Sequence, residues 1–178
     1  MRFLVKHILI LLLLFSIGFP VGIKAQNYVP NPGFEDVDTS GKHIWAPWRW
    51  MNTVDFYYMG DQIEIDKIRV VMTPNSGECF AGFRAWSDYK EILQIKLYRK
   101  MAASQKFLIS FYVRRPSYGN SYLKNIGVAL YVKPILYTVY NLYEKYPPQI
   151  VFDKHSGIQD TGWVKLSAVY TAIGGEDH

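Results

Sequence analysis

The clearest pattern along this chain is the alternation of apolar and polar residues. It runs through four stretches, which are residues 91–98, 106–115, 125–132 and 162–172. Successive side chains of a strand point to opposite faces, so a period of two predicts strands with one buried face. The apolar side chains that we expect to be buried are Leu93, Ile95, Phe107, Ile109, Phe111, Val128, Leu130, Val164 and Leu166.

Polar and turn-forming residues separate these stretches. They occupy residues 99–105, 115–121, 146–149 and 155–162. Several short strands joined by polar turns predict an all-β fold, arranged as an antiparallel β-sandwich. Helix-forming residues in 88–101 leave one local alternative, a short helix in place of the strand at 91–98.

Residues 1–25 have the organisation of a secretory signal peptide. Arg2 and Lys6 precede the uncharged run ILILLLLF, and Ala25 offers a small residue for cleavage. The apolar run is shorter than the roughly 18 to 20 residues that span a bilayer. We therefore expect an exported protein whose mature chain, residues 26–178, is a single domain without a transmembrane helix.

Export changes the meaning of the net charge. The chain has 20 Lys and Arg residues against 15 Asp and Glu residues, a net charge of +5. The signal segment holds three of the basic residues and none of the acidic ones. Residues 26–178 therefore keep 17 basic and 15 acidic residues, a net charge of +2. So small a charge is not typical of nucleic-acid-binding proteins, and we expect no nucleic acid partner.

The sequence carries no enzyme signature. Cys79 is the only cysteine, and its apolar neighbours predict a buried, inert thiol, with a reactive thiol as the alternative. The histidines after the signal segment form no His-Glu-x-x-His motif. There is neither a Gly-x-Ser-x-Gly elbow nor a phosphate-binding loop. We therefore expect a non-catalytic protein.

Aromatic residues are concentrated in residues 43–61. The candidates for ligand contacts in this stretch are Trp45, Trp48, Arg49, Trp50, Asp55 and Tyr57. Flat rings beside charged groups suit sugars, which present C–H faces ringed by hydroxyl groups. The alternative is that these rings pack under a loop as part of the core. A second group is spaced at intervals of three, which would align it on one side of a short helix; it comprises Tyr137, Tyr140, Tyr143 and Tyr146.

The stretch NPGFE, residues 31–35, follows the signal segment closely. Pro30 and Pro32 lack an N–H group, which suits the start of an extended segment, and Phe34 is a core candidate. Glu35 is a candidate metal ligand, because a structural Ca²⁺ prefers oxygen ligands. The alternative is a solvated or hydrogen-bonded carboxylate. We keep Ca²⁺ as the one possible cofactor.

Five stretches of the chain also carry a resemblance. They are VPNPGFED (29–36), TVDFYY (53–58), GECFAGFRAW (77–86), EILQIKL (91–97) followed by SFYVRR (110–115), and GWVKLSAVYTAIGGEDH (162–178). In this order they resemble the N-terminal, galactose-binding-like module of exported OmpA-family envelope proteins of Bacteroidetes. That module is similar to carbohydrate-binding modules, so the resemblance implies a jelly-roll sandwich.

The resemblance also carries expectations about what is missing. The family module continues into another strand and then into a C-terminal OmpA-like domain that holds peptidoglycan. Residues 26–178 would then lack the last strand and that domain. We expect either an unpaired edge near residues 31–35 or a loosely ordered tail. Lys124 stands where the family often has an acid, which weakens a metal site borrowed through that position.

Two classes of function follow from these observations. In the first, the chain is a binding module that recognises glycan at the cell surface or in the periplasm. In the second, it is a protein–protein interaction module of an outer-membrane or secretion assembly. Both place the protein in the periplasm, the outer membrane or at the cell surface. A shared fold cannot separate them, because function depends on the site.

Overall fold

The computed structural model describes residues 25–42, 45–51, 54–65, 68–83, 91–116, 125–135, 142–153 and 161–178. The described part is essentially all-β, as predicted. Its strands are β1 (Arg49–Met51), β2 (Asp55–Tyr58), β3 (Gln62–Ile65), β4 (Ile68–Val71), β5 (Cys79–Gly82), β6 (Ile92–Gln94), β7 (Lys106–Val113), β8 (Asn125–Val128), β9 (Ile150–Asp153) and β10 (Val164–Thr171). One four-residue helix, α2 (Leu142–Lys145), lies before β9. Residues 1–24, which hold most of the predicted signal peptide, lie outside the described residues, as does Lys124.

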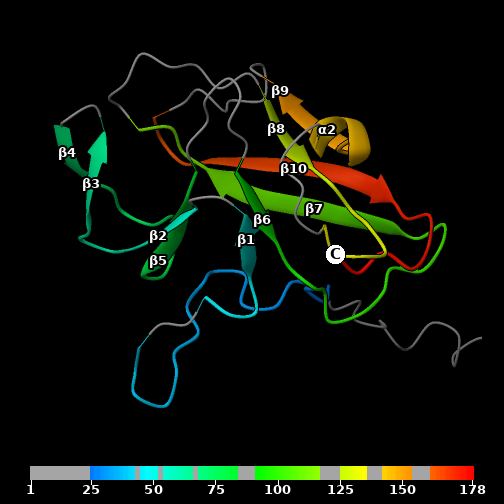
Figure 1. Cartoon of the computed structure of the whole chain (residues 1–178), viewed down its shortest axis with the longest axis horizontal. Coiled ribbons are helices and arrows are strands. Elements are labelled where there is room, and N and C mark those ends of the chain that lie inside the picture. The colour runs from blue at the N-terminus through cyan, green and yellow to red at the C-terminus, as the bar shows by residue number, and fades with distance from the viewer. Residues whose placement is uncertain are drawn as a thin grey trace, which may run out of the picture.

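The described strands pair two by two, and every pair is antiparallel. The pairs are β1 with β6, β2 with β5, β3 with β4, β7 with β10 and β8 with β9. Figure 1 shows the long β7–β10 pair across the middle of the molecule, with β8, β9 and α2 above it in this view. The antiparallel arrangement of the predicted fold is therefore confirmed at the level of strand pairs.

The β7–β10 pair shows why alternation predicts these strands. All eight residues of each strand are in register, from Val164 opposite Val113 to Thr171 opposite Lys106. Burial alternates along both strands, and Leu166 on the inner face is only 2% exposed. That face packs with Phe111 against Phe152 of β9, whose ring meets the Phe111 ring edge to face at 5.6 Å. Burial of this apolar face therefore holds the two strand pairs together.

A second group of buried residues lies beside the first. It comprises Ile95, Leu97, Met101, Leu130, Tyr170 and Ala172. The expected burial of Ile95, Leu130 and Leu166 is confirmed, while the other expected core residues, among them Leu93 and Val128, are partly buried. The helix considered for 88–101 is absent from its described part, where β6 forms instead. Val132 departs from the expected alternation, since it is 49% exposed.

The C-terminal residues 174–178 are held on both sides by backbone hydrogen bonds. The carbonyl of Asp177 accepts from Leu97 N at 2.7 Å, and the carbonyl of His178 accepts from Tyr131 N at 2.8 Å. The Glu176 side chain is fully buried. Its Oε1 accepts from the Tyr170 hydroxyl, and the backbone N–H groups of residues 173 and 174 donate to its two oxygens, all at 2.7 Å. Of the two expected alternatives, the loose tail does not agree with these bonds, which replace the solvent that a polar segment would otherwise need. The other alternative stays a prediction, since residues 31–35 belong to none of the described strands.

Within the described part of the chain, no helix is both long and apolar enough to cross a membrane.

Candidate functional site

The aromatic residues of 43–61 gather around one phenylalanine. We call this group the Phe56 cluster; it comprises Phe34, Trp45, Trp48, Trp50, Phe56 and Tyr58. Trp45 stacks on Phe56 with ring centres 4.5 Å apart, and Trp50 meets Phe56 edge to face at 5.2 Å. Phe34 contacts both Phe56, at 5.7 Å, and Trp48, at 5.1 Å. The cluster is therefore a packed unit that joins β1, β2 and the NPGFE turn.

Exposure separates the three tryptophans. Trp48 and Trp45 are partly buried, whereas Trp50 on β1 is 43% exposed and lies at the rim of the cluster. The Trp48 indole is fixed in place, because its Nε1 donates to the carbonyl of Asn31 at 2.7 Å. Arg49 is also exposed. Trp50 thus presents the largest open aromatic surface among the predicted tryptophans.

Asp55 and Tyr57 lie on the other face of β2. Alternate residues of a strand point to opposite sides, so they face away from Phe56. Tyr57 stacks on Phe80 of β5 at 5.3 Å, and its hydroxyl donates to Asp55 Oδ2 at 3.2 Å. Gly82 lies under the Tyr57 ring, where an added Cβ would come within 2.7 Å of Tyr57 Cε2. Five of the six predicted contact residues therefore form two groups on the two sides of β2, and Arg49 on β1 belongs to neither group.

Asn31 connects the NPGFE turn to the cluster, a role that sequence analysis did not assign to it. It is 5% exposed and has a positive φ of 41°. Its Nδ2 donates to Ala46 O at 3.3 Å, and its Oδ1 accepts from Asp36 N at 3.2 Å. Asparagine tolerates this backbone conformation and bonds nearby backbone groups, which is the signal that the sequence offered.

Glu35 holds the chain reversal before β5. Its Oε1 accepts hydrogen bonds from the backbone N–H groups of Glu78 and Cys79, both at 3.0 Å. Gly77 has a φ of 65° and lies so close to this carboxylate that an added Cβ would overlap it. Among the described residues, no three His, Cys, Asp or Glu side chains come together in a way that could hold a metal ion. The contacts of Glu35 are thus those of a hydrogen-bonded structural carboxylate.

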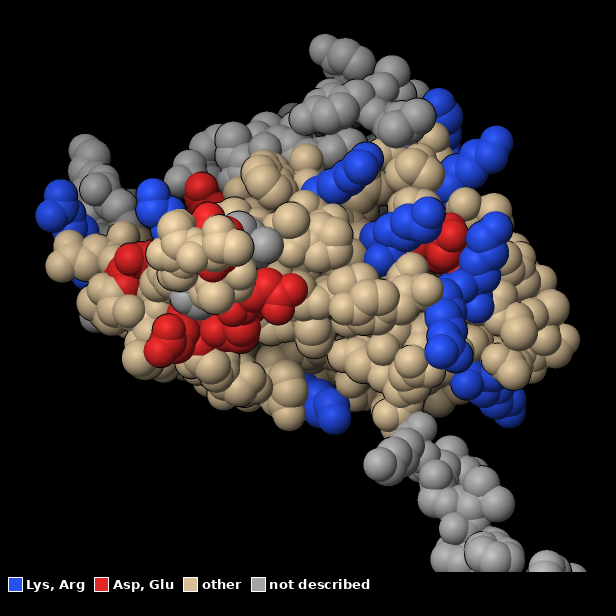
Figure 2. Space-filling model, turned by 90° about the horizontal axis from the view of Figure 1, so that it is seen from below, with Lys and Arg blue, Asp and Glu red and all other residues tan. Residues whose placement is uncertain are grey.

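Burial, and then its acidic surroundings, suppress the reactivity of Cys79. Cys79 is 4% exposed, as predicted for a buried thiol. Burial, and then the nearby Glu35, Glu78 and Asp61 carboxylates, raise the pKa of the Cys79 thiol to about 11. A thiol with so high a pKa is protonated near neutral pH and is a poor nucleophile. Figure 2 shows acidic side chains gathered toward the end of the molecule that carries β2 and β5.

The described residues therefore offer an exposed aromatic surface. Trp50 gives an apolar, planar contact area that the Phe56 cluster holds in place. Such a surface can bind the apolar face of a ring or chain without a bond being made or broken. Comparison with known protein families, with curated proteins and with solved structures finds no match to this chain.

Proposed function

We propose that this chain is a non-catalytic glycan-binding module of an exported cell-envelope protein. The carrying observation is Trp50, which is 43% exposed at the rim of the Phe56 cluster. The proposal includes a jelly-roll, galactose-binding-like sandwich, which the sequence resemblance and the antiparallel strand pairs support. Removal of the signal segment would deliver the module to the periplasm, the outer membrane or the cell surface.

The packing of Trp50 suits a sugar. Its ring is fixed from one side by Phe56, and its backbone is paired with Leu93 of β6. An immobilised ring loses little conformational entropy when a ligand stacks on it, so more of the contact energy remains for binding. Arg49 precedes Trp50 on β1 and therefore points to the opposite face. It would contact a glycan that extends past the strand rather than the sugar stacked on Trp50.

One observation favours the second candidate, a protein–protein interaction module. The outer face of the β7–β10 pair exposes Leu108 and Val169, which lie opposite each other in the register and are 67% and 64% exposed. Tyr112 on the same face of β7 is 47% exposed. Exposed large apolar side chains on one sheet face can form part of an interaction surface, although Ser110 and Ser167 separate Tyr112 from the Leu108–Val169 pair here. The Trp50 and β7–β10 surfaces are made by different strands, so separate substitutions can test them.

Binding to a panel of envelope and cell-surface polysaccharides tests the proposal, using protein from an exporting host. We expect Trp50→Ala to weaken binding by about 1 to 3 kcal/mol, taking the range for nucleic-acid bases that stack on aromatic side chains. Tyr112→Ala is the matched control, because Tyr112 has a similar exposure on a different face. Absence of binding by the unaltered protein to every glycan would overturn the proposal. Loss of binding with Tyr112→Ala but not with Trp50→Ala would also overturn the assignment of the site.

A further inference from the structure

One groove is lined by aromatic residues that do not belong to the Phe56 cluster. Tyr131, Val132, Lys133, Pro134 and Tyr146 line it, and its volume is about 490 Å³, within the range of small-ligand sites. The rings of Tyr131 and Tyr146 meet edge to face with centres 5.4 Å apart. Tyr146 belongs to the group of evenly spaced tyrosines noted in the sequence. Tyr137 and Tyr140 of that group lie outside the described residues.

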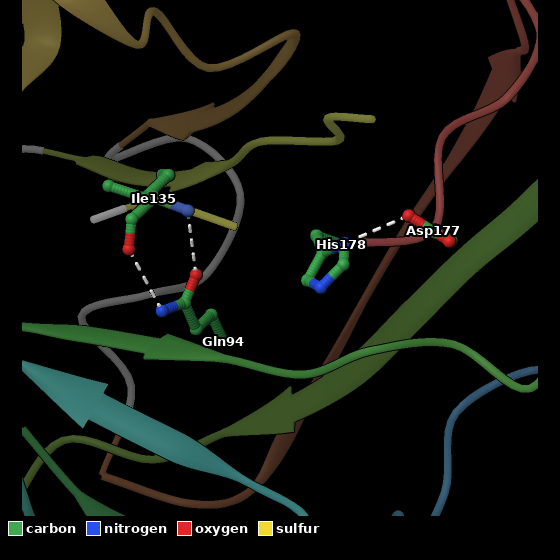
Figure 3. Close-up of polar contacts among 4 residues, drawn as sticks. All are labelled: Gln94, Ile135, Asp177 and His178. Atoms are coloured by element: carbon green, nitrogen blue, oxygen red, sulfur yellow. Dashed lines mark hydrogen bonds and ion pairs between the residues drawn. The ribbon is translucent and has the colours of Figure 1, made fainter. Parts of the chain in front are cut away.

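Segment 131–135, one wall of this groove, is fixed at both ends. At the first end, the Tyr131 hydroxyl donates to Pro147 O at 2.9 Å, and Tyr131 N bonds the carbonyl of His178. At the other end, Ile135 N donates to Gln94 Oε1 and Gln94 Nε2 donates to Ile135 O, both at 3.1 Å. Figure 3 shows this paired contact, with the His178 ring turned to Asp177 beside it. The groove is thus formed before any ligand arrives, which lowers the cost of binding.

The charges around the groove are mainly positive. Lys133 lines it, and Lys145 Nζ lies 5.6 Å from the centre of the Tyr146 ring. Neither lysine forms an ion pair with another described residue. Glu144 is adjacent in sequence, but it does not line the groove, and Asp177 contacts His178 Nδ1 at 2.8 Å. The groove therefore offers cations to an anionic ligand without a lining carboxylate to repel it.

Basic side chains continue beyond the groove. The C-terminal residues 174–178 form backbone hydrogen bonds with residues 97–101 on one side and with residue 131 on the other. These two partners of the tail therefore lie about two strand spacings apart, roughly 10 Å. Lys96, Arg99 and Lys100 are exposed on the far side. Figure 2 shows basic side chains gathered toward this end of the molecule, opposite the acidic end. An extended polyanion could therefore contact cations on both sides of the tail.

We propose that this groove binds a uronic acid unit of an acidic polysaccharide. The sugar's C–H face lies against the Tyr146 ring and its carboxylate pairs with Lys133, with Lys145 as a second cation. Combined aromatic and cationic contacts distinguish such a sugar from a neutral one, which lacks the charge, and from an acidic peptide, which lacks the flat C–H face. The site is independent of Trp50, so it stands whether or not a glycan binds the Phe56 cluster.

The test measures binding of the whole exported protein to polygalacturonate and to its fully methyl-esterified form, which has the same backbone without charge. We expect binding to polygalacturonate that weakens with added salt, and little binding to the ester. Lys133→Glu should reduce affinity roughly five- to tenfold, because an attraction becomes a repulsion. Lys106→Glu is the matched control, since Lys106 is exposed at the start of β7 and outside the groove. If Lys133→Glu fails to fold, Lys133→Gln replaces it, provided that its melting temperature equals that of the unaltered protein.

Further variants and ligands separate binding in the groove from a general attraction between charges. Tyr146→Phe should keep binding and Tyr146→Leu should weaken it, because only the former keeps the ring. Equal losses with Lys106→Glu and Lys133→Glu, equal binding of the ester, or equal binding of polyglutamate would each overturn the proposal. So would the absence of binding to polygalacturonate. Trp50→Ala should leave this binding unchanged; a loss there, with Lys133→Glu silent, would move the acidic glycan to the Phe56 cluster.

Discussion

The indole N–H of Trp48 donates a hydrogen bond of 2.7 Å to the backbone carbonyl of Asn31, seventeen residues earlier in the chain. The same carbonyl accepts from Phe34 N at 3.2 Å, which closes the NPGFE turn. Phe34 in turn packs on the Trp48 ring. The turn and the tryptophan therefore position each other. The motif thus fixes one side of the Phe56 cluster.

Trp48→Phe tests this hydrogen bond separately from the packing. The substitution keeps an aromatic ring against Phe34 but removes the donor to Asn31 O, so we expect a loss of about 1 kcal/mol in the free energy of unfolding. Urea denaturation measures it. Trp50→Phe is the control, because Trp50 is more exposed. A larger loss with Trp50→Phe than with Trp48→Phe would contradict this assignment.

Gly77 and Gly41 form a matched pair for the Glu35 contact. Both have a positive φ, 65° and 78°, but a Cβ on Gly41 meets nothing within 4 Å, whereas one on Gly77 overlaps the Glu35 carboxylate. Alanine at either site costs about 1 kcal/mol for the backbone conformation. We expect Gly77→Ala to cost at least about 1 kcal/mol more, since the bonds to Glu78 N and Cys79 N are disturbed. Equal melting temperatures for the two variants would show that the overlap is relieved at no cost.

Leu166 and Leu108 compare the two faces of the β7–β10 pair. Leu166 is 2% exposed against Phe152, and Leu108 is 67% exposed on the outer face. We expect Leu166→Ala to lower the free energy of unfolding by about 2 to 5 kcal/mol, and Leu108→Ala by less than about 1 kcal/mol. Chemical denaturation of both variants measures the two losses. Similar losses would mean that a partner or another segment covers the outer face.

The Tyr170–Glu176 pair predicts how stability depends on pH. Burial and the bond to Glu176 raise the pKa of Tyr170 from 10.0 to about 12. A raised folded-state pKa gives stability that is complete below pH 10 and is lost as pH rises through about 12. The unaltered protein should therefore lose stability between pH 10 and about 12 through Tyr170. Tyr170→Phe has no hydroxyl to titrate, so it should not show this part of the loss. Taking the difference between the two proteins removes the contribution of Cys79, whose raised pKa acts in both.

Glu176 acts at the acidic end of the pH range. Burial raises the pKa of its carboxyl, but hydrogen bonds from the Tyr170 hydroxyl and from backbone N–H groups outweigh burial, and the net direction is downward from 4.5. A lowered folded-state pKa gives stability that is present above pH 4.5 and is lost as pH falls below it. Glu176→Gln should be less stable at neutral pH and should show a smaller loss on acidification. Melting temperatures between pH 3 and 7 measure both effects, and parallel curves for the two proteins would contradict them.

The strands that the sequence predicted well are the ones with long alternation. β7 and β10 alternate over eight residues each, whereas β2 to β5 have four residues each, too few for a period to be recognised. The aromatic residues of 43–61 were recognised because they are dense in the sequence, but this density does not show to which face of a strand each ring points. The alternation of side chains along β2 could have predicted that Tyr57 and Phe56 point to opposite faces of the strand. The order of the polar tail could not be predicted, because its bonds come from distant residues 97 and 131.

The long β7–β10 ladder also constrains how the chain can reach its native state. Val113 and Val164 are register partners, so the ladder closes a loop that contains β8, α2 and β9. Closing so long a loop is entropically costly, and contacts far apart in sequence make folding slow. The β8–β9 pair spans a shorter separation and carries Phe152, so we expect it to form first and to offer the surface on which Phe111 and Leu166 close. Stopped-flow refolding would then show Phe152→Leu slowing folding and Leu166→Ala mainly speeding unfolding.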